Sequence, residues 1–248
     1  MSAKPHAILY RLATSQHLCP WGLRSLHLLR SRGYQVEDQL LTTPAANDAF
    51  KADHGVKTTP QAFIDGRRIG GYEDLRRYFG LKVRDPKALT YAPVIAVFGM
   101  AAAIAVALSE AVLGTPFTLS ALQWFIAIAM CLLALLKLRD LDGFATGFLG
   151  YDLLARRWVP YAKLYPFAEG IAGVLMLASP AFHWIASPIA LFIGSIGAIS
   201  VFKAVYIDKR ELKCACVGGD SNVPLGFISL TENLLMVGMA LWMTGEAF

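Results

Sequence analysis

The sequence predicts a small α/β domain over residues 1–85, followed over residues 90–248 by an all-α bundle of several membrane-spanning helices. Three observations support this division. Hydrophobic residues make up 56% of the chain, more than the roughly one half that is usual in a soluble domain. Residues 1–89 carry 14 Lys and Arg against 8 Asp and Glu, whereas residues 90–248 carry 9 against 10. Short strand and helix patterns occur before residue 85, and long uncharged apolar runs follow residue 90.

The first region alternates strands with helices. The run His6–Leu12 is β-like, and Asp65-Gly66 lies between two short apolar runs, which is typical of a hairpin turn. In chain order, the sequence predicts a strand over 6–12, a helix over 17–32, a strand over 35–41, a helix over 45–54, strands over 61–65 and 67–70, and a helix over 72–79.

The segment His17-Leu18-Cys19-Pro20-Trp21-Gly22 lies where the first strand gives way to the first helix. A helix N-terminus offers unpaired N–H groups and the positive end of the helix dipole, and both stabilise a thiolate. Pro20 suits the first turn because its missing N–H costs no hydrogen bond there. The sequence therefore predicts a reactive redox thiol at Cys19, with a buried structural cysteine as the alternative.

The element order and three motifs of this region resemble the thioredoxin fold, and glutaredoxins in particular. The motifs are Cys19-Pro20-Trp21-Gly22, Thr58-Thr59-Pro60-Gln61-Ala62-Phe63-Ile64-Asp65-Gly66 and Gly70-Gly71-Tyr72-Glu73-Asp74-Leu75. They follow one another in the order of that family. The resemblance therefore implies a thioredoxin-like domain that acts on thiols and disulfides.

The same resemblance implies a glutathione site, with glutathione as cosubstrate. Pro60 would be the cis-proline that presents the backbone of Thr59 to a bound thiol peptide. A turn and a helix start would hold the γ-glutamyl end, and Lys57 with Arg67 or Arg68 could pair the other carboxylate. The glutathione-binding residues that we expect are Pro20, Thr59, Pro60, Gly71, Tyr72, Glu73 and Asp74.

One position departs from the dithiol glutaredoxins, which carry a second cysteine where this chain has Gly22. Cys19 can attack a mixed disulfide, but it lacks a neighbour that resolves the adduct. Either glutathione or another thiol of this chain must do so. Some single-cysteine glutaredoxins bind iron–sulfur clusters, but those carry glycine directly after the cysteine, where this chain has Pro20. We therefore expect no bound metal.

Five apolar runs follow, each near the ~20 residues that cross a bilayer. Aromatic residues such as Trp158 and Trp184 lie near several of their ends, as at a membrane interface. The expected transmembrane helices cover about 91–113, 118–137, 161–179, 188–207 and 224–244.

Basic residues in this region are confined to alternate connections. The connections 114–117 and 179–187 carry no Lys or Arg, and the residues that lead into the first run are strongly basic. By the positive-inside rule, the N-terminal domain is cytoplasmic and the protein is a multi-pass protein of the inner (cytoplasmic) membrane. No secretory signal peptide is evident at Met1 to Tyr10. The basic connections contain Lys137, Arg139, Arg156, Arg157, Lys163, Lys203, Lys209, Arg210 and Lys213.

From residue 118 onward, the chain resembles the MauE/DoxX family of redox-associated four-helix membrane proteins. The motifs are Lys137-Leu138-Arg139-Asp140 with Gly143-Phe144, then Tyr151, Pro166-Phe167-Ala168-Glu169-Gly170 and Cys214-Ala215-Cys216-Val217-Gly218-Gly219. The run over 91–113 would then be an extra helix that joins the two modules. The resemblance implies a role in maturing a disulfide-containing client, as in methylamine utilisation.

Two acidic residues fall inside the predicted spans. Glu169 and Glu232 each lie about eight residues from the cytoplasmic end, which is roughly 12 Å at 1.5 Å per residue. An ionisable residue at such depth is a candidate for function. The alternative is that the two pair with each other or with Lys203 inside the bundle. Cys131 lies in an apolar run and is expected to serve packing.

These observations predict a membrane-anchored, glutathione-linked thiol–disulfide oxidoreductase with Cys19 as nucleophile and Cys214 and Cys216 as a membrane-side dithiol. Its partners would be glutathione, membrane lipid and a disulfide-containing client, and no pattern indicates nucleic-acid binding. Cys19 would exchange with the dithiol across a tether over 81–90, which spans at most ~35 Å. The alternatives are a soft-metal or small-molecule transporter with a regulatory glutaredoxin domain, and a non-catalytic assembly factor. The sequence does not predict the client or the direction of electron flow.

Overall fold

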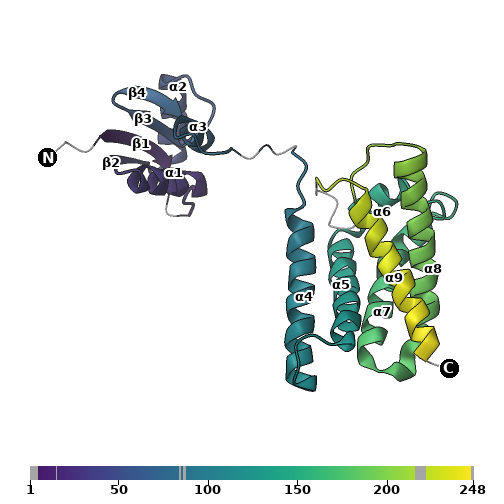
Figure 1. Ribbon diagram of the computed structural model, residues 1–248. Helices are drawn as coiled ribbons and strands as arrows, with labels where there is room; N and C mark the ends of the chain where they lie inside the picture. Colours follow the sequence, from purple (N-terminus) through teal and green to yellow (C-terminus); the bar gives the residue numbers. More distant parts are fainter. Residues whose placement is uncertain (1–4, 15, 84, 86–87, 216–221, 247–248) are drawn as a thin grey trace. The chain divides into compact units, whose positions relative to one another are not determined.

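The computed structural model describes residues 5–14, 16–83, 85, 88–215 and 222–246. The chain folds into two compact units, Met1–Pro86 and Lys87–Phe248. Figure 1 shows a sheet with helices in the first unit and long helices in the second. The predicted fold class, an α/β thioredoxin-like domain followed by an all-α helix bundle, is confirmed.

The first unit is built on a four-stranded mixed sheet in the order β2-β1-β3-β4. Strand β1 (His6–Leu12) lies in the centre and pairs in parallel with β2 (Gln35–Leu41) and antiparallel with β3 (Gln61–Ile64). Strand β4 (Arg67–Gly70) pairs antiparallel with β3 across the Asp65-Gly66 turn. These bounds match the predicted strands to within one residue.

Helices cover both faces of this sheet. Alternate residues of β1 point to opposite faces, so Leu9 packs under α1 (Pro20–Ser31) and α3 (Tyr72–Tyr78), while Tyr10 stacks at 4.6 Å on Phe50 of α2 (Pro44–Asp53). The core between the sheet and α1 is apolar. It contains Ala7, Leu9, Leu26, Leu29, Ala62, Ile64 and Leu75.

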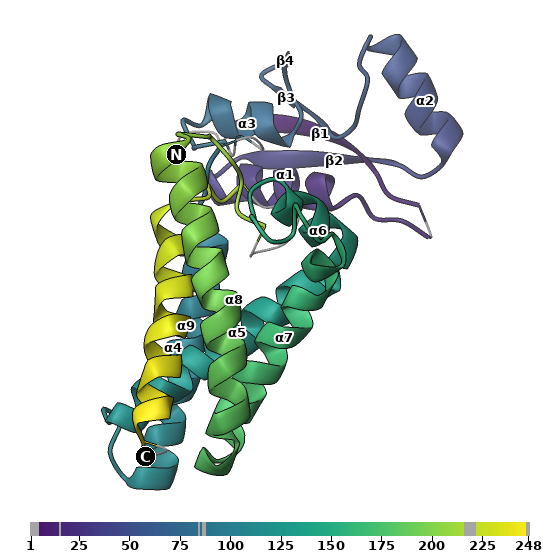
Figure 2. The same cartoon turned by 90° about the vertical axis from the view of Figure 1, so that its right-hand side faces the viewer.

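The second unit is a bundle of long helices with one short helix, α6. Helix α5 packs against α4 and α7, and α8 packs against α7 and α9 (Figure 2). A short 3-10 turn (Pro180–Phe182) precedes α8, and a π-helical turn (Lys203–Ile207) extends it. The helices are α4 (Ala92–Leu113), α5 (Leu119–Arg139), α6 (Leu141–Leu149), α7 (Pro160–Ala178), α8 (His183–Phe202) and α9 (Phe227–Glu246).

Among the described residues, four helical segments are long and apolar enough to cross a membrane: Ala92–Leu113, Leu119–Arg139, Pro180–Ile207 and Phe227–Gly245. The run predicted over 161–179 does form helix α7, but α7 is less apolar and is not one of these four. A fifth span at α7 therefore stays a prediction. Helix α8 begins at His183, five residues before the predicted fourth span, and it continues through Pro188.

The long helices alternate in direction, so their connections gather at two ends of the bundle. Figures 1 and 2 show α6 and the loop before α9 at the end where the chain enters α4, and the C-terminus at the other end. The connections with no Lys or Arg, 114–118 and 179–182, lie at the C-terminal end. The basic connections that the sequence predicts on one membrane side therefore share one end of the bundle.

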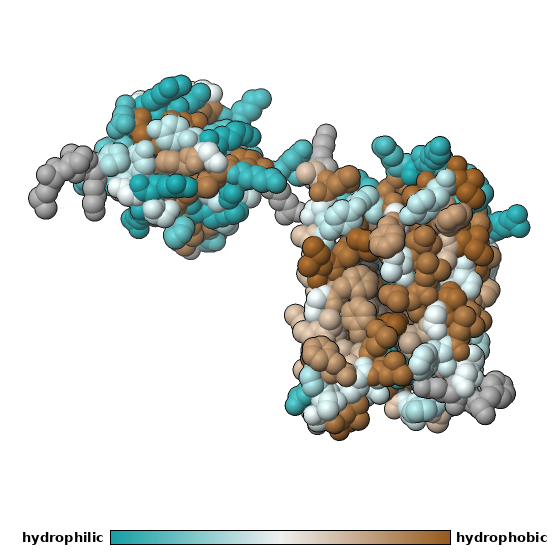
Figure 3. All heavy atoms as spheres, viewed as in Figure 1, coloured by the Kyte–Doolittle hydropathy of each residue, from teal (hydrophilic) through white to brown (hydrophobic). Residues whose placement is uncertain are grey.

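The flank of the bundle is apolar. In Figure 3, hydrophobic residues cover the side of the helical unit, and hydrophilic residues gather at the end that carries the basic connections. Large apolar side chains of α4 such as Ile95 and Val112 are exposed. Such a surface fits a lipid environment, and the second unit is the membrane part of a multi-pass protein.

Candidate functional site

Cys19 is the N-cap residue of α1. Its backbone is extended (φ −64°, ψ 113°), and Pro20 occupies the first helical turn as the sequence predicts. The Cys19 N–H donates to the carbonyl of Leu12 at 3.2 Å, which ties the helix start to the end of β1. The residue is 8% exposed. The thiol is therefore buried at the positive end of a helix, and Cys19 does not line the cavity that opens next to it.

Gly22 packs directly against the side chain of Arg11 on β1. A Cβ atom at Gly22 would lie 2.7 Å from Cβ and 2.9 Å from Cδ of Arg11. Real side chains do not approach so closely, so the stem of Arg11 occupies the space that a second thiol would need. The absence of a second cysteine at position 22 is therefore accompanied by an arginine side chain in the space where that cysteine would lie.

Arg11 is itself buried, with 9% of its side chain exposed. Its Nε and Nη2 donate to the two carboxylate oxygens of Asp38 on β2 at 2.8 and 2.7 Å, while its Nη1 has no hydrogen-bond partner among the described residues. The hydrogen bonds to Asp38 raise the pKa of Arg11, and a negative charge on Cys19 acts in the same direction. Arg11 therefore brings a fixed positive charge into the surroundings of Cys19.

A cavity of about 470 Å³ opens beside the start of α1. The Thr59–Pro60 peptide in its wall is cis, as the resemblance implies. The Thr59 hydroxyl donates to Oδ1 of Asn47 at 2.8 Å, which fixes this loop against α2. Six of the seven expected glutathione-binding residues line the cavity, and Pro20 does not. The lining residues are Trp21, Thr58, Thr59, Pro60, Gly71, Tyr72, Glu73, Asp74 and Arg77.

The rings of Trp21 and Tyr72 line one side of this cavity, and two arginines lie over these rings. The Trp21 and Tyr72 rings lie 5.7 Å apart, and the guanidinium of Arg24 lies 4.9 Å from the first ring centre and 4.5 Å from the second. Arg76 donates to the Tyr72 hydroxyl at 3.3 Å, and this hydrogen bond lowers the pKa of Tyr72. The two rings are tilted by 44° to each other, and the arginines place positive charge next to them.

The start of α3 forms the opposite, polar wall. Asp74 accepts a hydrogen bond from the Gly71 N–H at 3.0 Å and forms an ion pair with Arg77 at 2.6 Å. Arg77 is not among the site residues that the sequence predicts. Its position one helical turn after Glu73 and Asp74 is the signal that could have indicated it. Lys57, Arg67 and Arg68 do not line the cavity, and Arg68 instead donates to the carbonyl of His54 at 3.0 Å. Their expected role in holding a carboxylate is not supported.

In the second unit, Cys214 is buried at the basic end of the bundle. Its N–H donates to the carbonyl of Val223 at 2.8 Å, and its Sγ accepts a hydrogen bond from the hydroxyl of Ser229 on α9 at 3.1 Å. Cys216 lies outside the described residues. The same loop contacts the residues before α4, because the Thr90 N–H donates to the carbonyl of Asn222 at 3.2 Å.

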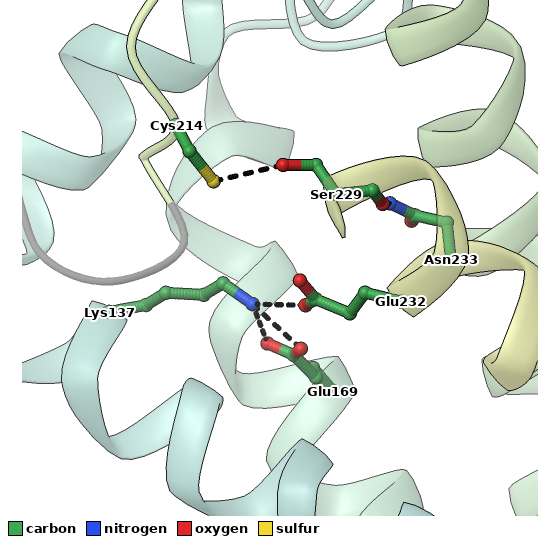
Figure 4. A network of polar contacts seen from close by, with 6 residues as sticks. All are labelled: Lys137, Glu169, Cys214, Ser229, Glu232 and Asn233. Carbon is green, nitrogen blue, oxygen red and sulfur yellow. Dashed lines mark hydrogen bonds and ion pairs between the residues drawn. The ribbon is translucent and has the colours of Figure 1, made fainter. Parts of the chain in front are cut away.

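Three ionisable side chains meet in the interior of the bundle, each from a different helix. Lys137 of α5 bonds both carboxylate oxygens of Glu169 of α7 at 2.7 and 2.6 Å, and Oε1 of Glu232 of α9 at 3.4 Å. Figure 4 shows this triad close to Cys214 and Ser229. We call Lys137, Glu169 and Glu232 the buried triad.

The buried triad corrects two expectations. Lys203 does not reach Glu169 or Glu232, because it pairs with Asp208 at 2.8 Å in an exposed bridge. Lys137, which the sequence assigns to a basic connection, is fully buried. Cys131, expected to serve packing, lies against Gly173 of α7, where an added Cβ would come within 2.8 Å of its sulfur.

Among the described residues, no three His, Cys, Asp or Glu side chains are grouped so that they could hold a metal ion.

Comparison with known proteins agrees with both units. The family model of the methylamine utilisation protein MauE matches residues 115–245. The chain belongs to the MauE family. Its MauE domain includes the buried triad, Cys214 and Ser229.

The region ahead of the MauE domain is similar to glutaredoxins. The chain is 33% identical over 70 residues to a probable glutaredoxin of Synechocystis, covering 27% of this chain and 80% of that protein. It is also 38% identical over 61 residues to a hybrid peroxiredoxin of Haemophilus influenzae, covering 25% of each. The chain thus spans about a quarter of the length of the peroxiredoxin. A glutaredoxin-like domain fused to a MauE membrane domain makes this a redox-associated membrane protein.

Proposed function

We propose that this protein is a membrane-anchored thiol–disulfide oxidoreductase that uses glutathione, with Cys19 as its nucleophile. The observation that carries the proposal is the cavity beside the start of α1, whose walls contain Thr59, cis Pro60 and the start of α3. Cys19 lies at the N-terminus of α1, and the positive charge of Arg11 is near it.

The chemistry of the cavity fits glutathione. The cysteinyl part of glutathione would pair with the backbone of Thr59, as an added strand does. Arg77 offers a guanidinium to a carboxylate, and the carboxylates of Glu73 and Asp74 offer partners to the ammonium group. The second carboxylate would lie near Tyr72, whose ring has the guanidinium of Arg24 over it.

Cys214 and Cys216 are proposed as the thiols with which Cys19 exchanges. In the reducing direction, the Cys19 thiolate attacks one sulfur of their disulfide, forms a mixed disulfide and releases the other sulfur as a thiolate. A first glutathione then cleaves the mixed disulfide and leaves Cys19 glutathionylated. A second releases oxidised glutathione and restores Cys19. Two glutathiones lose an electron pair, the loop disulfide gains it, and the two glutathione protons end on the loop thiols.

The position of the Cys214 loop supports this exchange. Residues 212–214 pair with 223–225 through two backbone hydrogen bonds of 2.8 Å, and Asn222 accepts from Thr90 at the end of the tether. The residues that lead into α4 therefore contact the loop that carries Cys214 and Cys216. By the positive-inside rule, the basic connections support a position of this end on the cytoplasmic side of the inner membrane, near anionic lipid.

The proposed client is a disulfide-containing protein, as expected for a MauE domain.

A non-catalytic assembly factor would need the cavity and would not need the thiol of Cys19. Glutathione-dependent reduction of a small disulfide by the full-length protein in detergent separates the two. We expect Cys19→Ser to abolish the activity and Cys131→Ser to leave it unchanged. Equal activity in the Cys19→Ser variant would refute the proposed function.

A further inference from the structure

The buried triad has an unbalanced charge. Lys137 and Glu169 are fully buried and Glu232 is 6% exposed, so water does not screen them. With all three ionised, one ammonium faces two carboxylates, and the site has a net charge of −1. A buried net charge is costly, and such groups take up or release a proton instead. The neutral form of this site contains one additional proton, shared by the two carboxyl groups.

We propose that the buried triad is a proton-binding site that serves Cys214, holding one exchangeable proton between Glu169 and Glu232. Its geometry separates the two carboxyl groups. Lys137 bonds both oxygens of Glu169 within 2.7 Å but lies 3.4 Å from Glu232, so the single ammonium is closely paired with only one of the two carboxyl groups.

Helix α9 links this proton to the sulfur of Cys214. Ser229 and Glu232 are three residues apart on α9 and therefore share a face. The Ser229 hydroxyl donates to Cys214 Sγ at 3.1 Å, and its carbonyl accepts from Nδ2 of Asn233 at 2.7 Å, which fixes this turn. In the view of Figure 4, the carboxyl group of Glu232 lies between the Cys214–Ser229 pair and Glu169.

The step rests on the proposed exchange at Cys214. When an incoming thiolate cleaves a disulfide to Cys214, the electron pair of the S–S bond stays on Cys214 Sγ. The proton shared by the two carboxyl groups of the triad then moves to that sulfur, so a thiol forms and the triad becomes anionic. The glutathione thiol then releases its proton, which reaches the triad through water and restores the neutral form of the triad. In the oxidising direction, the triad takes the proton from the thiol.

Other titratable and aromatic groups lie near the triad. On α7, Tyr165 lies with its ring centre 5.3 Å from Nζ of Lys137, and Tyr161 is near enough for the charge of Glu169 to act on it. On α5, the charge of Glu169 also acts on the thiol of Cys131. Helix α6 contributes Phe144, with its ring centre 6.0 Å from Nζ. The phenols and the thiol stay neutral at pH 7, so the two carboxyl groups and Lys137 dominate the charge.

Infrared spectroscopy of the full-length protein in lipid tests for the proton directly, because the C=O stretch of a protonated carboxyl group is separate from carboxylate bands. We expect this band at pH 7 in the wild type. Both Glu169→Gln and Glu232→Gln should remove it, since each leaves Lys137 with one carboxylate in a neutral site and should fold. A wild type without the band, or a band that survives in both variants, would overturn the proton-binding site. This measurement does not involve Cys19, so it is independent of the proposed function.

The coupling to Cys214 is tested by its alkylation rate against pH in a background of Cys19→Ser, Cys131→Ser and Cys216→Ser. Above the pH at which the triad loses its proton, the added negative charge opposes thiolate formation. Glu232→Gln should therefore react about tenfold faster at high pH and equally fast at low pH. Glu211→Gln, an exposed change of the same charge on the same loop, is the control and should have no effect. Identical profiles in wild type and Glu232→Gln would overturn the coupling, and so would a Cys214 that no reagent modifies.

Discussion

Substitution of Gly22 by Cys would recreate the dithiol pattern of a glutaredoxin, yet the structure predicts that it gives no working dithiol. The new Cβ would lie 2.7 Å from Cβ of Arg11. Overpacking of this kind costs about 1–3 kcal/mol. Loss of a glycine from a helix interior would otherwise gain up to about 1 kcal/mol. A net loss of stability therefore identifies the contact with Arg11 as the cause.

The matching experiment removes the obstacle. Arg11→Ala combined with Asp38→Ala deletes the side chain that fills the space, together with the carboxylate that it would leave unpaired. In that background Gly22→Cys should be tolerated, and the introduced thiol should form a disulfide with Cys19. Gly22→Ala serves as the control, because it adds the same Cβ without a thiol and should cost about the same stability in the presence of Arg11.

Thermal unfolding and mass-spectrometric disulfide mapping of the full-length protein provide the two readouts. We expect Gly22→Cys alone to be destabilised and to lack a disulfide with Cys19, and the triple variant to contain it. If Gly22→Cys alone is as stable as the wild type and forms that disulfide, the explanation of the single-cysteine site by Arg11 is wrong.

Three further predictions concern side chains of both units. Arg77→Gln should weaken glutathione binding by roughly tenfold or more, since a hydrogen bond to a charged group contributes about 1.5–3 kcal/mol. Calorimetry measures this affinity, and the control variant Arg68→Gln should bind glutathione as tightly as the wild type. Lys137→Met leaves two buried carboxylates without their cation and should cost about 3–5 kcal/mol, whereas unfolding of Lys203→Met should differ by no more than about 1 kcal/mol. Burial raises the pKa of Asp152, so the folded protein binds its proton more tightly than the unfolded chain. Wild-type stability should therefore fall as pH rises above about 4, and an unfolding temperature for Asp152→Asn that shows the same fall would contradict this.

Much of the first unit could be predicted from sequence because its elements are locally encoded. The strand before Cys19, the Asp65-Gly66 turn and the motif at Pro60 each specify a short structure, and their order identifies the fold. Sequence order also brought Thr59, Tyr72 and Asp74 into one cavity, because the resemblance carries the tertiary arrangement with it.

Contacts between distant side chains could not be predicted in this way. Arg11 reads as an ordinary basic residue at a strand end, and its contact with Gly22 depends on how α1 packs on β1. Lys137 lies at the end of an apolar run, where a basic residue normally marks a membrane boundary. Its burial depends on α7 and α9 each supplying an acidic residue at the same level, and no local pattern contains that information.

The central claim is that Cys19 exchanges with the thiols of the MauE domain. Its most direct test is mass-spectrometric mapping of disulfides in the Cys216→Ser variant, held in inside-out membrane vesicles and treated with oxidised glutathione. Without Cys216, a mixed disulfide at Cys214 cannot be resolved within the loop and should accumulate. The account predicts a peptide that links Cys19 to Cys214. A glutathione adduct on Cys19 with Cys214 left as a thiol, or accessible only from the opposite membrane face, would contradict it.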